Sequence, residues 1–177
     1  MVARVQALHP GVTCWCPQLP PSPQAAIALL RQGVADWPWQ RMVVVGSSLG
    51  GFYATWIAEH TGCRAVLLNP AVAPARDLAR YIGEHTSWHQ PEERFYFDPA
   101  FIAELQALTL HNQPPPERYR VLIAQGDEVL DWREMATRYA SAQPTVLPGG
   151  DHALTDFGEH MDGVFQFLHL LPGPAST

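Results

Sequence analysis

Residues 41–60 read Arg-Met-Val-Val-Val-Gly-Ser-Ser-Leu-Gly-Gly-Phe-Tyr-Ala-Thr-Trp-Ile-Ala-Glu-His, a short apolar run followed by a glycine-rich turn and a longer helix-forming stretch. The apolar run predicts a strand over 42–45, and the last part predicts a helix over 49–60 that ends near Gly62. Gly46 and Gly50 stand two positions before and two after Ser48, so the chain can turn sharply there and hold a non-glycine residue in a strained conformation. Ser47 lacks this spacing, so the pattern selects Ser48.

A strand, a G-x-S-x-G turn and a helix in this order are the context in which a serine is presented as a nucleophile at the edge of a sheet. The alternative is that Ser48 is an ordinary N-cap of the helix. Agreement of all three elements favours the nucleophile. The backbone N–H of the next residue, Leu49, would then be one donor of an oxyanion hole.

The rest of the chain repeats the alternation of apolar runs and helix-forming stretches, with its prolines gathered in the connections. Strands are predicted over 12–16, 42–45, 65–68, 119–124 and 145–147. Helices are predicted over 23–32 after an N-cap at Ser22, over 49–60 and 100–108, over 135–140 after a capping box from Asp131 to Glu134, and in a last stretch from Asp156 onward. Apolar strands alternating with helices predict an α/β fold with a mostly parallel sheet flanked by helices.

A nucleophilic serine needs a histidine to take its proton and a carboxylate to orient that histidine. Ligands of such sheets bind beyond the carboxyl ends of the strands. Of the eight histidines, His152 alone stands in a glycine-rich loop, Gly149-Gly-Asp-His152, between the last predicted strand and the last helix. His152 is therefore the predicted base, and the alternative is a loop histidine with no task.

The predicted acid follows the strand over 119–124. Asp127 stands next to the end of that strand, whereas Asp131 already has a structural role as the N-cap of the next helix. Asp127 is the preferred partner of His152, and Asp131 is the substitute. The resulting chain order of Ser48, Asp127 and His152 is that of α/β-hydrolases.

Four blocks of the sequence together resemble the YqiA/YcfP-like bacterial esterases, a family of small α/β-hydrolases. The blocks are Gly46 to Trp56, Leu67-Leu-Asn-Pro-Ala-Val72, Gly126-Asp-Glu-Val-Leu-Asp131 and Gly149-Gly-Asp-His152. The resemblance implies a serine carboxylic-ester hydrolase that forms an acyl-enzyme on Ser48, uses neither a metal nor an organic cofactor, and acts on a small-molecule ester. It leaves open whether thioesters are also cleaved.

About fifty residues separate Asn69 from Tyr119, more than the dozen or so that a crossover between parallel strands requires. We expect the surplus to form a small helical, lid-like insertion at about 84–117. The whole stretch from Asn69 to Tyr119 is rich in aromatic residues, which either bind an acyl chain or pack the insertion onto the sheet: Tyr81, Trp88, Phe95, Tyr96, Phe97 and Phe101. His85 and His89 are spaced like a metal pair but lack the Glu of an H-E-x-x-H pattern, so no metal site is predicted.

The composition narrows the class of protein. A chain of 177 residues that is 47% hydrophobic suits a single domain over 1–177. Its 11 basic and 17 acidic residues give a net charge of −6 and no basic stripe, which excludes nucleic acid and anionic membrane surfaces as favoured partners. No apolar run approaches the ~18–20 residues that cross a bilayer, and the first residues lack a signal-peptide core, so we expect a cytoplasmic location.

The resemblance also leads us to expect a strand that ends in a His-Gly loop ahead of residue 1. That strand would lie centrally in the sheet, and its loop would donate a second oxyanion-hole N–H. We therefore expect the native reading frame to extend upstream by about twenty residues. Two other functions stay open: a catalytically silent α/β-hydrolase that acts as a binding module, and acyl transfer to an alcohol instead of water.

Overall fold

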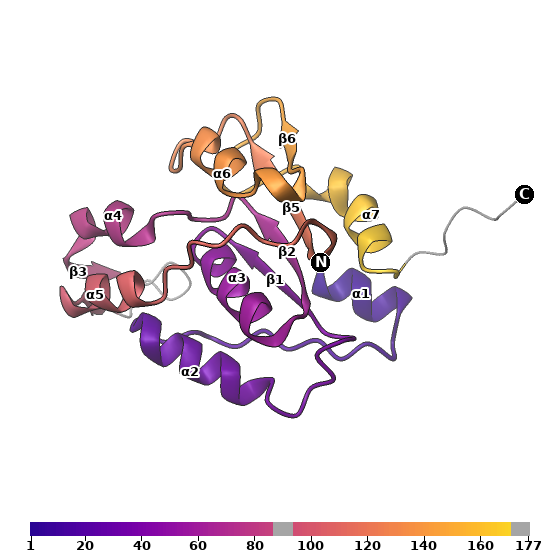
Figure 1. Cartoon of the computed structure of the whole chain (residues 1–177), viewed down its shortest axis with the longest axis horizontal. Coiled ribbons are helices and arrows are strands. Elements are labelled where there is room, and N and C mark those ends of the chain that lie inside the picture. The colour runs from indigo at the N-terminus through magenta and orange to yellow at the C-terminus, as the bar shows by residue number, and fades with distance from the viewer. Residues whose placement is uncertain (87–93, 171–177) are drawn as a thin grey trace, which may run out of the picture.

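The structure is a computed structural model, and it describes residues 1–86 and 94–170 (Figure 1). Its α-helices are α1 (Val2–Leu8), α2 (Pro23–Gly33), α3 (Leu49–Thr61), α4 (Pro74–Leu78), α5 (Ala100–Ala107), α6 (Trp132–Arg138) and α7 (Phe157–Phe167). Its strands are β1 (Val43–Ser47), β2 (Arg64–Leu68), β3 (Gly83–Thr86), β4 (Arg94–Phe97), β5 (Tyr119–Ala124) and β6 (Thr145–Leu147). Short 3₁₀ helices cover Ala79–Tyr81, Pro116–Arg118 and Ala140–Ala142.

The main sheet has the order β1-β2-β5-β6, and all three pairings are parallel. Parallel strands need helical crossovers, and the helices cover both faces of the sheet (Figure 1). On one face, α3 and α6 pack against side chains such as Leu67 and Ile123. On the other face, α1 and α7 pack against the alternate residues, among them Val66 and Leu122. The predicted α/β architecture with a mostly parallel sheet is confirmed.

The strand predicted over 12–16 is wrong, because this segment joins no sheet in the described residues. Its apolar residues find other partners: Cys14 packs partly buried against the cluster around α1 and α7, and the ring of Trp15 lies directly over Gly33 of α2. Apolar alternation does not make a strand without a neighbouring strand, and β1 pairs in the described sheet with β2 alone.

The insertion between β2 and β5 contains more than the one helix, over 100–108, that the sequence predicts. It holds α4 and α5 and also an antiparallel hairpin of β3 and β4, which pairs Gly83 with Phe97. It packs against α2, since Leu105 and Phe97 join Ala26 and Ile27 in one buried cluster. The hydroxyl of Ser22 and the backbone N–H of Gln24 bond the Glu104 carboxylate, at 2.7 and 2.9 Å.

Two of the aromatic residues of the insertion have a packing role. Phe97 and Phe101 contact each other edge to face with ring centroids 5.4 Å apart, and both belong to the cluster with α2. Tyr81 and Tyr96 are exposed. Trp88 and His89 lie outside the described residues, as do the side chains of His85 and Phe95. A lid function of this segment stays a prediction.

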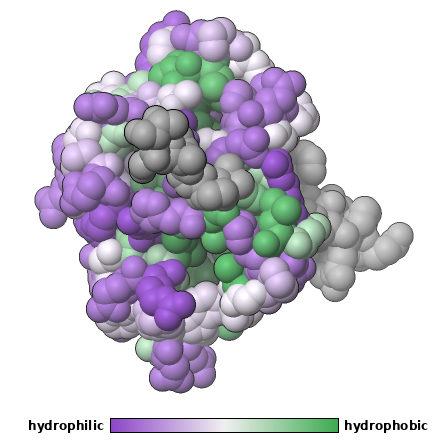
Figure 2. Space-filling view, turned by 90° about the vertical axis from the view of Figure 1, so that its right-hand side faces the viewer, coloured by the Kyte–Doolittle hydropathy of each residue, from purple (hydrophilic) through white to green (hydrophobic). Residues whose placement is uncertain are grey.

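The surface on the side of α1 and α7 is mixed in polarity. Figure 2 shows several exposed hydrophobic areas there, separated by polar side chains. Within α1, Val2 and Leu8 are exposed while Val5 is buried. The longest helix of the described residues, α3, has 13 residues, so nothing in residues 1–86 and 94–170 forms a helix able to span a membrane.

Candidate active site

Ser48 lies between β1 and α3 with φ 52° and ψ −122°, a conformation that L-residues rarely adopt. Its backbone is fixed from three sides: its N–H donates to the carbonyl of Leu68, and its own carbonyl accepts from the N–H groups of Gly51 and Ala71. A Cβ on Gly46 would stand only 2.1 Å from the carbonyl oxygen of Gly50, so this tight turn requires glycine. The strained conformation predicted for Ser48 is confirmed.

The side chain of Ser48 makes no capping bond to α3 and instead contacts a histidine. Its Oγ lies 3.0 Å from Nε2 of His152, and Nδ1 of the same ring lies 2.9 Å from Oδ2 and 3.0 Å from Oδ1 of Asp127. The Asp127 carboxylate is fully buried, and the imidazole is 22% exposed. Three side chains that are far apart in the sequence thus form one hydrogen-bonded chain at the carboxyl ends of β1, β5 and β6.

Asp131 lies elsewhere. It is the N-cap of α6, where its Oδ1 accepts from the backbone N–H of Arg133 at 2.9 Å, as the sequence predicts. Glu134, which the capping-box pattern directs back toward Asp131, instead binds Arg76 with both carboxylate oxygens, at 2.9 and 2.7 Å. The structure therefore brings Asp127 to His152 and leaves Asp131 at the helix end.

The loop around His152 has contacts that the sequence analysis missed. The Asn69 amide donates to the carbonyl oxygens of Asp151 and His152, and Glu128 accepts from the backbone N–H of His152. Hydrogen bonds from the backbone N–H and the hydroxyl of Thr155 lower the pKa of the Asp151 carboxyl. The available signal for Asn69 is its place directly after β2, at the strand end where polar side chains of such sheets meet, although an amide is neither a nucleophile nor a base nor an acid.

Leu49 is the first residue of α3, as the sequence predicts. Its backbone N–H therefore has no acceptor within the helix and lies next to the Ser48 side chain along the chain. The positive end of the helix dipole adds to the preference of this position for negative charge. Leu49 suits the predicted role of an oxyanion donor.

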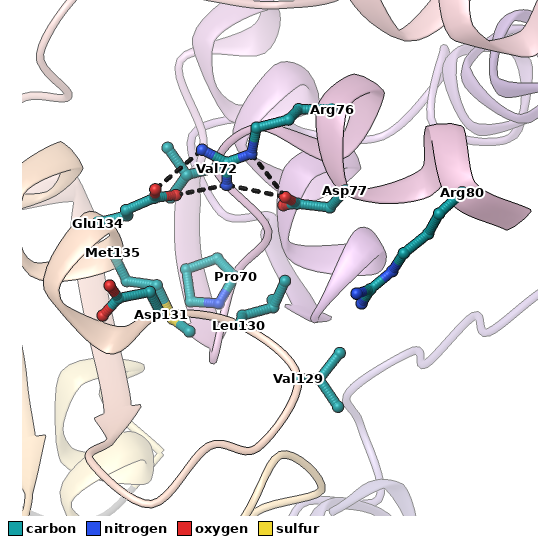
Figure 3. A pocket seen from close by; sticks show the side chains of 10 residues that line it. All are labelled: Pro70, Val72, Arg76, Asp77, Arg80, Val129, Leu130, Asp131, Glu134 and Met135. Atoms are coloured by element: carbon teal, nitrogen blue, oxygen red, sulfur yellow. Dashed lines mark hydrogen bonds and ion pairs between the residues drawn. The ribbon is translucent and has the colours of Figure 1, made fainter.

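A cavity of about 230 Å³ lies between α4 and α6, bordered by the loops that follow β2 and β5 (Figure 3). Its apolar wall is formed by Pro70, Val72, Val129, Leu130 and Met135, and its charged wall by Arg76, Asp77, Arg80, Asp131 and Glu134. Within the charged wall, Arg76 bonds Asp77 and Glu134 together, and its hydrogen bonds lower the pKa of the Glu134 carboxyl.

One of the two loops that border the cavity contains Asp127, and the other contacts Ser48. Ala71, which stands between the lining residues Pro70 and Val72, donates its backbone N–H to the Ser48 carbonyl. The backbone N–H groups of Val129 and Leu130 both donate to Oδ1 of Asp127, each at 2.8 Å. A ligand in the cavity would therefore lie against the same backbone that positions Ser48 and Asp127.

Residues 1–86 and 94–170 contain no group of three or more His, Cys, Asp and Glu side chains arranged to hold a metal ion.

A family model described as Uncharacterised protein family (UPF0227) matches residues 1–169. Among solved structures, the chain is similar to Est1E from Butyrivibrio proteoclasticus, solved with ferulic acid bound (TM-score 0.60, 14% identity, 84% of this chain and 68% of that one). It is also similar to a monoacylglycerol lipase from Paleococcus ferrophilus (TM-score 0.55, 14% identity, 85% of this chain and 76% of that one). A third similar structure is an alpha/beta superfamily hydrolase from Oenococcus oeni PSU-1 (TM-score 0.53, 18% identity, 86% of this chain and 77% of that one). At these identities the similarity establishes the α/β-hydrolase fold.

Proposed function

Since the chain belongs to the UPF0227 family, the YqiA/YcfP family that its motifs resemble, and has an α/β-hydrolase fold, we propose that it is a serine esterase. The observation that carries the proposal is the 3.0 Å contact between Oγ of a strained Ser48 and Nε2 of His152, whose other nitrogen bonds a buried carboxylate. A hydroxyl, a base and an orienting acid in this order are the parts that acyl transfer to water requires.

In the proposed reaction, Ser48 Oγ attacks the ester carbonyl while His152 Nε2 takes the hydroxyl proton. Asp127 holds the ring in the tautomer with Nδ1–H and stabilises the imidazolium that forms. The Leu49 N–H donates to the oxyanion of the tetrahedral intermediate. His152 then gives its proton to the leaving alcohol, which leaves an acyl group on Ser48. Water then attacks the acyl carbonyl while His152 takes a proton from the water, and His152 gives that proton to Ser48 Oγ as the carboxylic acid is released.

The proposal is tested by labelling with a fluorophosphonate, which reacts covalently with an activated serine hydroxyl. We expect mass spectrometry of the intact, folded protein to find one adduct, located on the peptide that contains Ser48. A hydroxyl without an adjacent base does not react at a comparable rate, so the other serines serve as internal controls. Folded protein with no adduct on Ser48 would contradict catalysis and favour a binding module.

We further propose that one side of the ester, either its acyl or its alcohol part, occupies the cavity between α4 and α6. Two observations support this placement. Val129 and Leu130 on its wall bond Asp127, while Pro70 and Val72 flank Ala71, which bonds Ser48. Five of the ten lining residues are apolar. Apolar walls with a few polar groups are typical of small-molecule sites. The substrate is accordingly a small-molecule ester.

Filling the cavity should weaken substrate binding. Val129 lies on the cavity wall and is 46% exposed, so we expect Val129→Trp to fold and to occupy space in the cavity. The expected result is a rise in KM of about 10-fold for a p-nitrophenyl butyrate substrate, equivalent to ~1.4 kcal/mol of lost binding. Val12→Trp, at another exposed valine, is the matched control and should leave KM unchanged. An unchanged KM in Val129→Trp would place the substrate elsewhere.

A further inference from the structure

Asn69 is a completely buried polar residue at the carboxyl end of β2. Its amide connects three segments: Oδ1 accepts from the backbone N–H of Ala124 at the end of β5, at 2.8 Å, and Nδ2 donates to the carbonyls of Asp151 and His152, at 3.0 and 3.1 Å. Both N–H groups of the amide are thus used on the loop that carries His152. No other described residue joins this loop to the ends of both central strands.

The loop before His152 contains two glycines, and the N–H of Gly126, which follows β5, donates to the carbonyl of Gly149. Gly149 and Gly150 have φ angles of 73° and 74°, which glycine adopts without strain and which leave the backbone many other conformations. The backbone of His152 is held on both sides, because Glu128 accepts from its N–H at 3.0 Å and Asn69 donates to its carbonyl. Its ring nitrogens are held by Asp127 and Ser48.

We propose that Asn69 is a positioning residue that sets the place of the His152 ring relative to Ser48, with the exposed Glu128 as a weaker second support. This inference rests on the proposed esterase function. Proton transfer requires the imidazole within hydrogen-bond reach of the hydroxyl, and a displacement of about 1 Å costs about 10²-fold in rate. Through two hydrogen bonds, Asn69 ties the glycine-containing loop to the end of β2.

Few other side chains could make these hydrogen bonds in the place of Asn69. Asn69 has φ 41°, in the left-handed region that asparagine tolerates better than most residues. An aspartate has the same shape, but as a carboxylate it has no N–H to donate, and its oxygen would face two carbonyl oxygens. Alanine would be strained at this φ. Asn69→Gly removes the amide and keeps the backbone conformation, which makes it the cleanest test.

The test compares Asn69→Gly with Tyr139→Phe. The control removes another buried hydrogen bond, between the hydroxyls of Tyr139 and Thr55 at 2.9 Å, at a place away from the loop. Both variants should lower the melting temperature. We expect Asn69→Gly to lower kcat about 10²-fold with KM changed less than twofold, and Tyr139→Phe to leave both constants unchanged. In a His152→Ala background, Asn69→Gly should have no further effect on the residual rate, because residues that act as a unit are not additive.

A second readout does not depend on activity. The Nδ1–H proton between His152 and Asp127 should give a downfield ¹H resonance in wild type and Tyr139→Phe, and a broadened or absent one in Asn69→Gly. If wild type has this resonance but no esterase activity, the proposed function fails while the positioning role stands. An unchanged resonance and an unchanged kcat in folded Asn69→Gly would overturn the positioning role. So would an equal loss of rate from Asn69→Gly in the wild-type and the His152→Ala backgrounds.

If Asn69→Gly does not fold, a variant of the exposed Glu128 tests whether the backbone contacts of the loop position His152. Glu128→Ala removes the acceptor of the His152 N–H at the surface, and we expect a loss of kcat of about 10-fold, smaller than that of Asn69→Gly because one of several contacts of the loop is lost. The same downfield resonance should broaden. An unchanged kcat and resonance in this variant would overturn the inference that the backbone contacts of the loop position His152.

Discussion

Ser48→Ala is expected to lower kcat by about 10⁶-fold, the effect that removal of the serine has in well-studied serine proteases. Alanine lacks the Oγ that attacks the carbonyl, and no other described hydroxyl lies within hydrogen-bond distance of His152. The variant should fold, because the backbone contacts of residue 48 with Leu68, Gly51 and Ala71 do not involve its side chain. The measurement is hydrolysis of p-nitrophenyl butyrate, corrected for the spontaneous rate.

The control for this variant is Ser47→Ala. Ser47 is exposed, is one residue away, and lies outside the G-x-S-x-G spacing, so this variant should retain wild-type kcat. Loss of activity in Ser47→Ala together with retention of activity in Ser48→Ala would show that Ser47, and not the Ser48 chosen from the glycine spacing, is the nucleophile. Retention of activity in both would exclude a serine acyl-enzyme.

The second large effect is expected for Asp127→Asn, with a loss in kcat of about 10⁴-fold. The asparagine Oδ1 can still accept from the N–H groups of Val129 and Leu130, so the loop should keep its shape. The new NH₂ group, however, would donate to Nδ1 of His152 and force the proton to Nε2, where the ring can no longer act as base toward Ser48. Melting temperature and kcat, measured on the same preparation, separate a loss of stability from a loss of catalysis.

Asp131→Ala provides the comparison, since both residues are aspartates on one loop. Loss of the N-cap of α6 should reduce the free energy of unfolding by about 1 kcal/mol. Because Asp131 lines the cavity but does not contact His152, its loss should change kcat far less than Asp127→Asn does. An active Asp127→Asn together with an inactive Asp131→Ala would transfer the role of the acid to Asp131 despite the observed hydrogen bonds.

The sequence predicted the parts of the fold that depend on local pattern. The bounds of β5 and β6 agree with prediction to the residue, and Ser48, Asp127 and His152 lie together because carboxyl ends of parallel strands meet at one edge. The Ser22 and Asp131 caps were also predictable, since each depends on a few consecutive residues.

The parts that were missed depend on contacts between distant segments. The failed strand over 12–16 has the right alternation but no strand beside it. The hairpin of β3 and β4 lies in a segment with no clear turn pattern. Glu134 has a good local capping pattern, yet it binds Arg76, which is 58 residues away. Likewise, nothing near Asn69 in the chain indicates that its amide reaches the loop at 151–152.

The strained residues at the carboxyl edge have a consequence for protein engineering. Ser48 and Asn69 both have positive φ, a conformation that costs on the order of 1–3 kcal/mol at a non-glycine residue. Selection for heat resistance alone would favour substitutions that relieve this strain, and such gains commonly reduce activity. Directed evolution of a more durable form should therefore hold this edge constant and draw its diversity from the opposite end of the strands.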